Sequence, residues 1–362
     1  MKVTCVGKHL TVAVSTVERF TSRHITLPIL SNILFQTKER ALSLIATNLE
    51  LGIEYTIPAK VQKPGAATAP ARPLTQALAA FEGEVINIES RDQHLCLKNP
   101  TTNLTFFGQN PSDFPTIPSI KPEFSFTIPA SVLVPALERI LPACATSALK
   151  PEFSGVLFKS TANSLTLAAT DSFRLAEQRI NDTSLRGSAE AIIPARTLEE
   201  LIRIVPAEAD IVVSVGEHQI VCTWNGKRIL SRLIDGAYPP YQNIIPSSFE
   251  TTITARREDL LRMIRLASVF TSRLNDVTLR FGPTELIIST AGETGETSSR
   301  LAVKGRGASS SSVFNHRFLS DGLAAAGGEE VVISLNGVSG PARIQNPADP
   351  SYFYLLMPIR AV

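Results

Sequence analysis

The chain has 362 residues, of which 44% are hydrophobic and 19% charged, and its net charge is +2. This composition is ordinary for a globular protein with a buried core, and the near-neutral charge argues against a polybasic protein that coats nucleic acid. Any contact with DNA must therefore come from positive charge gathered on one face.

The four cysteines stand apart in the sequence, at Cys5, Cys96, Cys144 and Cys222. No Cys-x-x-Cys pair occurs, so we expect buried free thiols in a reducing compartment rather than disulfides or a zinc site. No run approaches about 18 apolar residues, and the first ten residues have no apolar signal core. We therefore expect a soluble, cytoplasmic protein with no metal and no cofactor.

A unit of two short strands followed by a polar corner occurs three times. Phe35, Phe158 and Phe281 mark it at an interval of 123 residues, twice over. This period is far longer than the roughly 20–50 residues of a solenoid repeat, so it indicates domain triplication. The three copies of the unit are Ser31–Leu51, Phe153–Leu175 and Asn275–Glu293. The expected domains are residues 1–120, 121–245 and 246–362.

Each repeat has the same predicted order of strand, helix, strands, helix and strands. Alternating polarity predicts the opening strands, and apolar residues at helical spacing predict the helices. This order is typical of an α+β domain with two helices packed on one face of an antiparallel sheet. The expected opening strands are residues 2–7, Phe124–Ile128 and Glu250–Thr254. The expected helices are Lys8–Thr21, Ala71–Phe81, Ala130–Leu141, Ala195–Val205, Arg256–Phe270 and His316–Ala326.

Two segments depart from this pattern. Pro135 lies within the second expected first helix, where it should occupy the first turn or kink the helix. Lys304–Ser312 contains two glycines and four consecutive serines, so we expect a mobile loop in the third domain.

No motif in the sequence indicates catalysis. There is no Gly-rich phosphate loop, no His-Glu-x-x-His and no Gly-x-Ser-x-Gly. Asp171 and Arg174 could form an acid and an anion clamp, but an Asp that closes a turn beside a surface Arg is the simpler interpretation. We therefore expect a protein that is not an enzyme. Two features remain: basic residues at matching helix positions, and the apolar terminal segment Tyr352–Ile359, which should dock into its own sheet and complete a groove.

Six sets of short motifs occur along the chain: Leu27–Leu30 with Asn32, Pro64–Ala66 with Pro70–Arg72, Asp113–Pro115, Ala169–Asp171 with Arg174–Leu175, Asp235–Gly236 with Tyr238–Pro239, and Met357–Arg360. Together they resemble the bacterial DNA sliding clamp, the beta subunit of DNA polymerase III. The resemblance implies three clamp-type domains in each chain and a head-to-tail homodimer that assembles into a closed ring around double-stranded DNA without reading its sequence. It also implies that the chain is a processivity factor that tethers the catalytic subunit of the polymerase, the clamp loader and other proteins with a clamp-binding motif.

The resemblance assigns roles to particular residues. For DNA binding these are Arg23, His24, Arg72, Lys150 and Arg196, and for the dimer interface Leu104, Phe106, Val269 and Phe270. For the partner-peptide pocket they are Phe153, Thr170, Ser172, Phe173, Arg174, Leu175, Pro239, Ile244, Val338, Gly340, Leu355, Met357, Pro358, Ile359 and Arg360.

The sequence departs from the family pattern at three places. Ser172 and Phe173 replace the usual Gly-His pair, His24 stands where arginine is common, and the chain ends one residue later than usual. Two other functions compete with the clamp: a triplicated protein-binding scaffold that does not encircle DNA, and a sequence-specific DNA-binding protein. No helix-turn-helix or zinc-finger pattern supports the second.

Overall fold

The computed structural model describes residues 1–22, 26–81, 84–118, 120–147, 150–181 and 188–359. The chain forms two compact units. The first consists of Met1–Ser131 and Arg203–Leu233, and the second of Val132–Ile202 and Ile234–Val362. No helix among the described residues is both long enough and apolar enough to cross a membrane.

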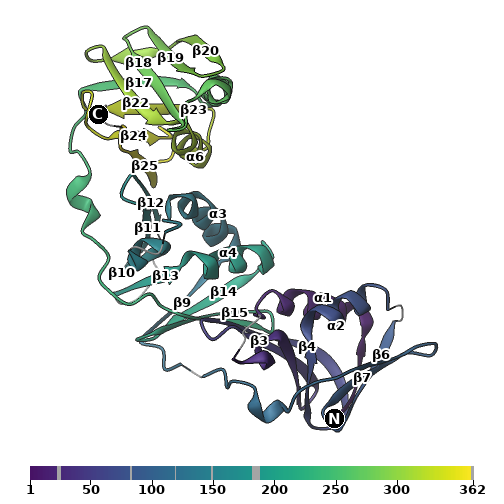
Figure 1. Ribbon diagram of the computed structural model, residues 1–362. Helices are drawn as coiled ribbons and strands as arrows, with labels where there is room; N and C mark the ends of the chain where they lie inside the picture. Colours follow the sequence, from purple (N-terminus) through teal and green to yellow (C-terminus); the bar gives the residue numbers. More distant parts are fainter. Residues whose placement is uncertain (23–25, 82–83, 119, 148–149, 182–187, 360–362) are drawn as a thin grey trace. The chain divides into compact units, whose positions relative to one another are not determined.

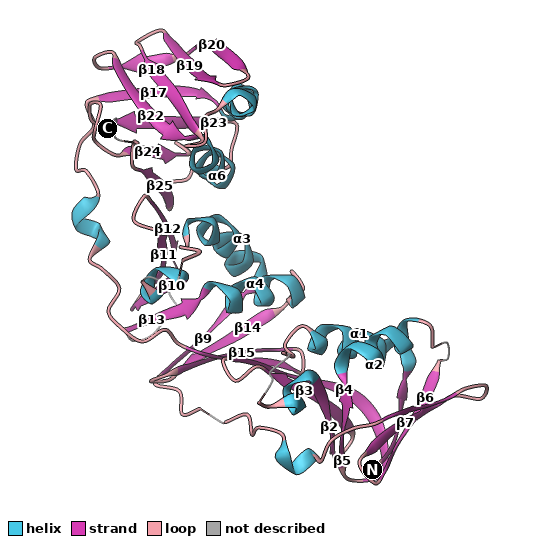
Figure 2. Ribbon diagram, in the orientation of Figure 1, coloured by secondary structure: helices cyan, strands magenta, loops and turns pink. Residues whose placement is uncertain are grey.

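The first unit is built on a 12-stranded sheet whose main path runs β8-β7-β6-β1-β4-β16-β15-β14-β9. Strands β2, β3 and β5 extend from this path, because β3 pairs with β4 and β2 pairs with both β3 and β5. Helices α1 and α2 lie side by side against the strands of this unit (Figures 1 and 2). The elements are β1 (Lys2–Val6), α1 (Gly7–Glu18), η1 (Pro28–Ser31), β2 (Asn32–Lys38), β3 (Ala41–Thr47), β4 (Leu51–Lys63), β5 (Ala66–Pro70), α2 (Ala71–Ala79), β6 (Val85–Arg91), β7 (His94–Lys98), β8 (Asn103–Phe106), η2 (Pro111–Asp113), β9 (Phe124–Pro129), β14 (Asp210–Val215), β15 (Gln219–Trp224) and β16 (Lys227–Arg232).

The second unit contains a nine-stranded sheet of order β13-β10-β11-β12-β25-β24-β23-β17-β21 and a four-stranded sheet of order β20-β19-β18-β22. The apolar terminal strand β25 docks between β12 and β24, as the sequence predicts. The elements are η3 (Leu141–Ala143), η4 (Pro151–Ser154), β10 (Gly155–Thr161), β11 (Ser164–Thr170), β12 (Arg174–Asn181), β13 (Ala189–Pro194), η5 (Tyr241–Ile244), β17 (Thr251–Arg256), α5 (Arg257–Ala267), η6 (Ser268–Phe270), β18 (Asp276–Phe281), β19 (Glu285–Gly292), β20 (Gly295–Ala302), β21 (Lys304–Arg306), β22 (Ser310–Asn315), α6 (His316–Ala326), β23 (Glu330–Leu335), β24 (Ala342–Gln345) and β25 (Tyr352–Leu356).

The boundary between the units falls within α3 (Ala130–Ile140) and α4 (Ala195–Ile204). All six predicted helices are present and begin within one residue of the expected start. The helical spacing of the apolar residues explains this agreement, because the apolar residues that predict each helix form its buried face. In α5, Leu260, Ile264 and Ala267 are buried, whereas Arg262 and Arg265 are exposed.

One prediction about local structure needs correction, and another keeps one of its two alternatives. The expected mobile loop Lys304–Ser312 is mostly strand, because β21 pairs with β17 and β22 pairs with β18. Ser312 is buried in that sheet, so composition misled the prediction: serine is a poor guide where the backbone is paired. Pro135 is the sixth residue of α3, which continues past it to Ile140, so the first turn is excluded and a kink in the helix stays a prediction.

All four cysteines are buried free thiols, which confirms that prediction. Burial raises the pKa of the Cys5, Cys144 and Cys222 thiols to about 12. These side chains therefore stay protonated and pack as small apolar groups.

The strand that follows the polar corner has a related position in each repeat. In the first two repeats it accepts the last strand of the next repeat, so that β4 pairs with β16 and β12 pairs with β25. In the third repeat the equivalent strand is β20, which lies at the edge of its sheet in the described part of the chain. Strand β8, the last strand of the first repeat, is likewise at a sheet edge.

Candidate peptide-binding groove

The turn between β11 and β12 carries the side chains that were expected to bind a partner. Asp171 Oδ1 accepts hydrogen bonds from the backbone N–H of Phe173 at 2.9 Å and of Arg174 at 3.0 Å. The Thr170 hydroxyl donates to the Arg174 carbonyl at 2.6 Å and accepts from the Ser172 N–H at 3.2 Å. Ser172 has a φ of +78°, a left-handed conformation in which small residues are favoured. The turn is thus fixed by its own side chains and holds Phe173 outward, with 63% of its surface exposed.

Arg174 is largely buried beside this turn, so its expected place on the surface is wrong. Its side chain is only 11% exposed. The guanidinium donates to Asp171 Oδ2 at 2.9 Å and to Asp321 Oδ2 at 2.5 Å. It also lies 4.1 Å from the centroid of the Phe318 ring, within cation–π range. Because Asp321 and Phe318 belong to α6, Arg174 fastens the turn to that helix.

The end of β25 forms the opposite wall of the groove. Met357 continues the β12–β25 pairing by donating its N–H to the Phe173 carbonyl at 2.8 Å. The Ile359 N–H donates to the Val313 carbonyl at 2.7 Å, which holds the residues after β25 against β22. Met357, Pro358 and Ile359 are therefore ordered by backbone bonds while their side chains remain partly exposed.

Two cavities flank Phe173 and Met357. The larger has a volume of about 600 Å³ and adds α6 and the segment before β18 to the walls. The smaller, of about 20 Å³, lies on the Thr170 side and is close to the space of a single water. The larger is lined by Ser172, Phe173, Leu274, Asn315, Phe318, Met357, Pro358 and Ile359. The smaller is lined by Thr170, Ser172, Phe173, Arg174, Leu175, Ile244, Pro341, Leu355 and Met357.

The groove rests on a well-packed apolar base. Leu157, Leu175 and Leu355 belong to a buried cluster that includes Tyr238 and Tyr241, two tyrosines of the proline-rich linker at residues 236–246. Tyr241 donates to Glu177 Oε2 at 2.6 Å, and burial raises the pKa of its phenol, so the hydroxyl remains a donor. This linker is consequently part of the core, and a ligand would meet a pre-formed surface.

Most of the predicted pocket residues meet in this groove. Phe153 does not line either cavity, because it is buried and packs edge-on to Tyr238 at 6.4 Å between ring centroids. Pro239, Val338 and Gly340 also line neither cavity, and their role remains a prediction. Arg360 lies outside the described residues.

Sequence reasoning missed Leu274, Asn315, Phe318 and Pro341 as lining residues and Asp321 as the partner of Arg174. Part of the signal was present, because Asn315 is a typical helix-capping residue directly before the predicted helix and Phe318 lies in the first turn of that helix. Their proximity to the turn at Asp171 depends on tertiary packing, which no local pattern reports.

The predicted DNA-contacting residues are distributed over both units. Arg72 and Arg196 each occupy the second position of a helix, α2 and α4, and both are exposed. Lys150 is exposed, and its Nζ lies 5.0 Å from the Phe153 ring centroid. Arg23 and His24 lie outside the described residues.

The predicted dimer residues lie at two sheet edges or beside them. Leu104 and Phe106 are in β8, where Phe106 is buried and the adjacent Phe107 is 76% exposed. Val269 is 68% exposed, and Phe270 lies against Gly295 at the start of β20.

This chain has a triplicated α+β scaffold with a peptide-sized groove beside its terminal strand. These features are typical of the clamp proteins. Three family models for the DNA polymerase III beta subunit match the chain in order: the N-terminal domain at residues 1–118, the central domain at 127–240 and the C-terminal domain at 242–360. The chain belongs to the DNA polymerase III beta subunit family, whose members are non-catalytic processivity factors.

Known members of the family match over their whole length. The beta sliding clamp of Synechocystis sp. is 29% identical over 392 residues and is covered completely, as is this chain. The crystal structure of the sliding clamp from Bacillus subtilis has 25% identity and a TM-score of 0.96, with full coverage of both chains. That of the clamp from Pseudomonas aeruginosa bound to griselimycin has 24% identity and a TM-score of 0.95, again with full coverage, and supports the fold.

Proposed function

We propose that this protein is a DNA sliding clamp that closes as a homodimeric ring around duplex DNA and tethers a replicative polymerase. The observation that carries the proposal is the complete, ordered match of all three repeats to the clamp family. The match supports the domain limits 1–120, 121–245 and 246–362. The clamp loader and proteins with a clamp-binding motif would use the groove at Phe173 and Met357. A function on chromosomal DNA, together with four buried thiols, favours the cytoplasm.

The topology supports head-to-tail closure of the ring. Strand β4 is covered by β16, and β12 is covered by β25, in each case the last strand of the next repeat. The third repeat exposes the edge of β20, and the first exposes the edge of β8. Pairing of β20 in one copy with β8 in a second copy would continue the same pattern and cover both edges. A scaffold that does not encircle DNA would leave this regularity unexplained.

A ring would also explain the small net charge. A protein linked topologically to DNA needs only weak phosphate contacts, and strong ones would hinder sliding. Arg72 and Arg196, at the N-terminal ends of α2 and α4, would provide such weak phosphate contacts. Neither contact requires an element that reads the base sequence.

The experiment that tests ring closure is retention on circular DNA. Protein placed on nicked circular duplex by a clamp loader should stay bound through gel filtration and should be released when a restriction enzyme linearises the DNA. The Val269→Ala/Phe270→Ala variant should be monomeric at low concentration and lost from both DNAs, because it removes apolar contact area at the β20 edge. Equal release from circular and linear DNA by the unchanged protein would refute the ring. A double variant that stays dimeric would place the interface elsewhere.

A second prediction concerns the exposed arginines. Changing Arg72 and Arg196 to Glu should weaken binding to short linear duplex by at least about tenfold at low salt, because the variant replaces phosphate attraction with repulsion. Folding should change little, since exposed helix positions tolerate substitution. Affinity should be measured by fluorescence anisotropy over a salt series with two unrelated sequences. A binding constant that is independent of salt, or that differs between the sequences, would contradict the proposal.

A further inference from the structure

The first unit contains a cavity built around a turn that repeats the one in the groove. Thr47–Leu51 lies 123 residues before Thr170–Arg174. Asn48 Oδ1 accepts from the N–H groups of Glu50 at 3.0 Å and Leu51 at 2.7 Å, as Asp171 does in the other turn. Thr47 Oγ1 donates to the Leu51 carbonyl at 3.1 Å and accepts from the Leu49 N–H at 3.0 Å. Leu49 has a φ of +77°, against +78° at Ser172.

The strand beside this turn also repeats the arrangement of the groove. Strand β16 pairs with β4 so that Leu230 lies opposite Gly52, as Leu355 lies opposite Leu175. Beyond the last pair, the Arg232 N–H donates to the Glu50 carbonyl at 2.9 Å, just as the Met357 N–H donates to the Phe173 carbonyl at 2.8 Å. The two sites are therefore built from equivalent backbone.

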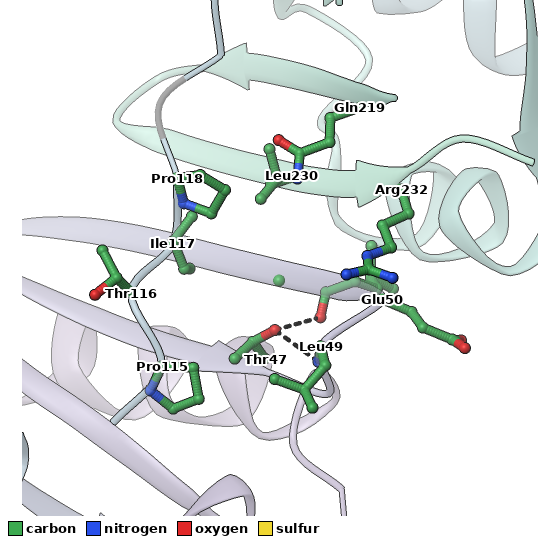
Figure 3. Close-up of a pocket in the computed structure, with 12 residues that line it drawn as sticks. Thr47, Leu49, Glu50, Pro115, Thr116, Ile117, Pro118, Gln219, Leu230 and Arg232 are labelled. Atoms are coloured by element: carbon green, nitrogen blue, oxygen red, sulfur yellow. Dashed lines mark hydrogen bonds between the residues drawn. The ribbon is translucent and has the colours of Figure 1, made fainter. Parts of the chain in front are cut away.

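The cavity at the first turn is much larger than its counterpart on the Thr170 side. Its volume is about 310 Å³, against about 20 Å³. Gly52 stands where the other site has Leu175, and a Cβ built there would lie 3.3 Å from the Ile117 side chain. The Ile117 side chain and Thr47 Oγ1 therefore lie against the bare Gly52 backbone and take the place that a larger side chain would fill. Figure 3 shows Pro115, Ile117 and Pro118, from the segment between η2 and β9, along one side of the cavity, with Leu49 and Arg232 across from them.

The rim of this cavity has a different chemistry from the groove. Arg232 stands at the position equivalent to Met357, and Glu50 stands at the position equivalent to Phe173. In Figure 3 the Glu50 carboxylate is directed away from the cavity, whereas the Arg232 guanidinium lies at its edge. Within the described part of the chain, no hydrogen bond or ion pair to the guanidinium occurs. An apolar hollow is thus bordered by one unpaired positive charge, the complement of a carboxylate next to an aliphatic side chain.

We propose that this cavity binds a short extended peptide segment of a partner protein in which an aliphatic residue is followed by an acidic one. The aliphatic side chain would enter above Gly52, between Ile117 and Leu230, and the carboxylate would pair with Arg232. The site goes beyond the proposed function, because it lies in the first unit and would give each chain a second, chemically distinct peptide site.

The proposal is tested with two matched probes, acetyl-Leu-Leu-Asp-Glu-amide and its neutral form acetyl-Leu-Leu-Asn-Gln-amide. Binding is followed by the NMR shift of the Ile117 methyl group in the full-length protein, with the groove at Phe173 saturated by a Gln-Leu-Ser-Leu-Phe peptide. The acidic probe should bind about tenfold more tightly than the neutral one, since a charge-assisted hydrogen bond to a rim arginine is worth about 1.4 kcal/mol. Arg232→Met, which installs the residue of the equivalent position, should abolish this preference.

Arg91→Met serves as the control, because Arg91 is an exposed arginine on β6 outside the cavity lining. It should keep the full preference for the acidic probe. The unchanged methyl spectrum outside the site, and unchanged binding of the Gln-Leu-Ser-Leu-Phe peptide, will show that Arg232→Met is folded. An Ile117 methyl that neither probe shifts, or an acidic preference that survives Arg232→Met, would overturn the proposal. Neither result would bear on ring closure, which retention on circular DNA tests separately.

Discussion

Removing Met357–Val362 is expected to weaken binding of a Gln-Leu-Ser-Leu-Phe peptide by about 2–4 kcal/mol, a factor of roughly 30 to 700. Met357, Pro358 and Ile359 form one wall of the larger cavity, and Met357 also borders the smaller one. Their loss removes three of the six apolar side chains that line the larger cavity, which a leucine or aromatic side chain of the peptide would contact. Isothermal titration calorimetry on the intact and truncated proteins measures the difference.

The fold should survive this truncation. Strand β25 ends at Leu356 and keeps its pairing with β12 and β24. Among the described residues, the deletion removes the backbone hydrogen bonds from Met357 to Phe173 and from Ile359 to Val313. Deleting Ala361 and Val362 alone is the matched control, which should bind with nearly the original affinity. Retention of the truncated protein on circular DNA should be unchanged. Equal peptide affinity of the intact and the Met357-truncated protein would place the peptide site elsewhere.

The repeats could be predicted because the same pattern of strands and helices occurs three times in the sequence. An isolated run such as Gly155–Phe158 has no unique interpretation, but the same run at intervals of 123 residues fixes both its type and its place in the domain. The helices could be predicted equally well, since the apolar residues at helical spacing, such as those of α5, are the residues that the fold buries. The segment Lys304–Ser312 was not, because its strands are stabilised by pairing with β17 and β18 rather than by their own composition.

The groove could be predicted only in part. The turn at Asp171 and the terminal residues could be recognised in the sequence, because aromatic and apolar side chains occur there next to polar ones. The contributions of Asp321 and Phe318 depend on where α6 docks, more than 140 residues away in the chain. The cavity at Thr47 escaped prediction for a related reason: it forms where Pro115, Ile117 and Pro118 approach the turn, more than 60 residues away in the chain.

Replacing Arg174 with Ala is expected to lower the stability of the second unit by about 2–3 kcal/mol and to weaken peptide binding as well. Loss of one partner from a buried ion pair typically costs about 3–5 kcal/mol, and the lower value applies here because Asp321 is 40% exposed and can regain water. The variant also removes the cation–π contact with Phe318, which lines the larger cavity. The turn and α6 would then move independently, and the groove would lose its fixed width.

The effect of Arg174→Ala is measured by hydrogen exchange at the amides of β12 and β25, which reports local opening of the second unit. Trp224, the single tryptophan of the chain, lies in the first unit, so its fluorescence midpoint in denaturant should stay constant. Lys159→Ala is the matched control: it breaks an exposed ion pair with Glu190 at 2.9 Å and should cost less than about 1 kcal/mol. Arg174→Lys should fall between the two, because lysine keeps the charge but cannot bridge both aspartates with a planar fork. The β12 amides could instead be as well protected from exchange in Arg174→Ala as in Lys159→Ala. In that case the ion pairs to Asp171 and Asp321 do not hold the groove together, and its shape depends on the apolar base around Leu175 and Leu355 alone.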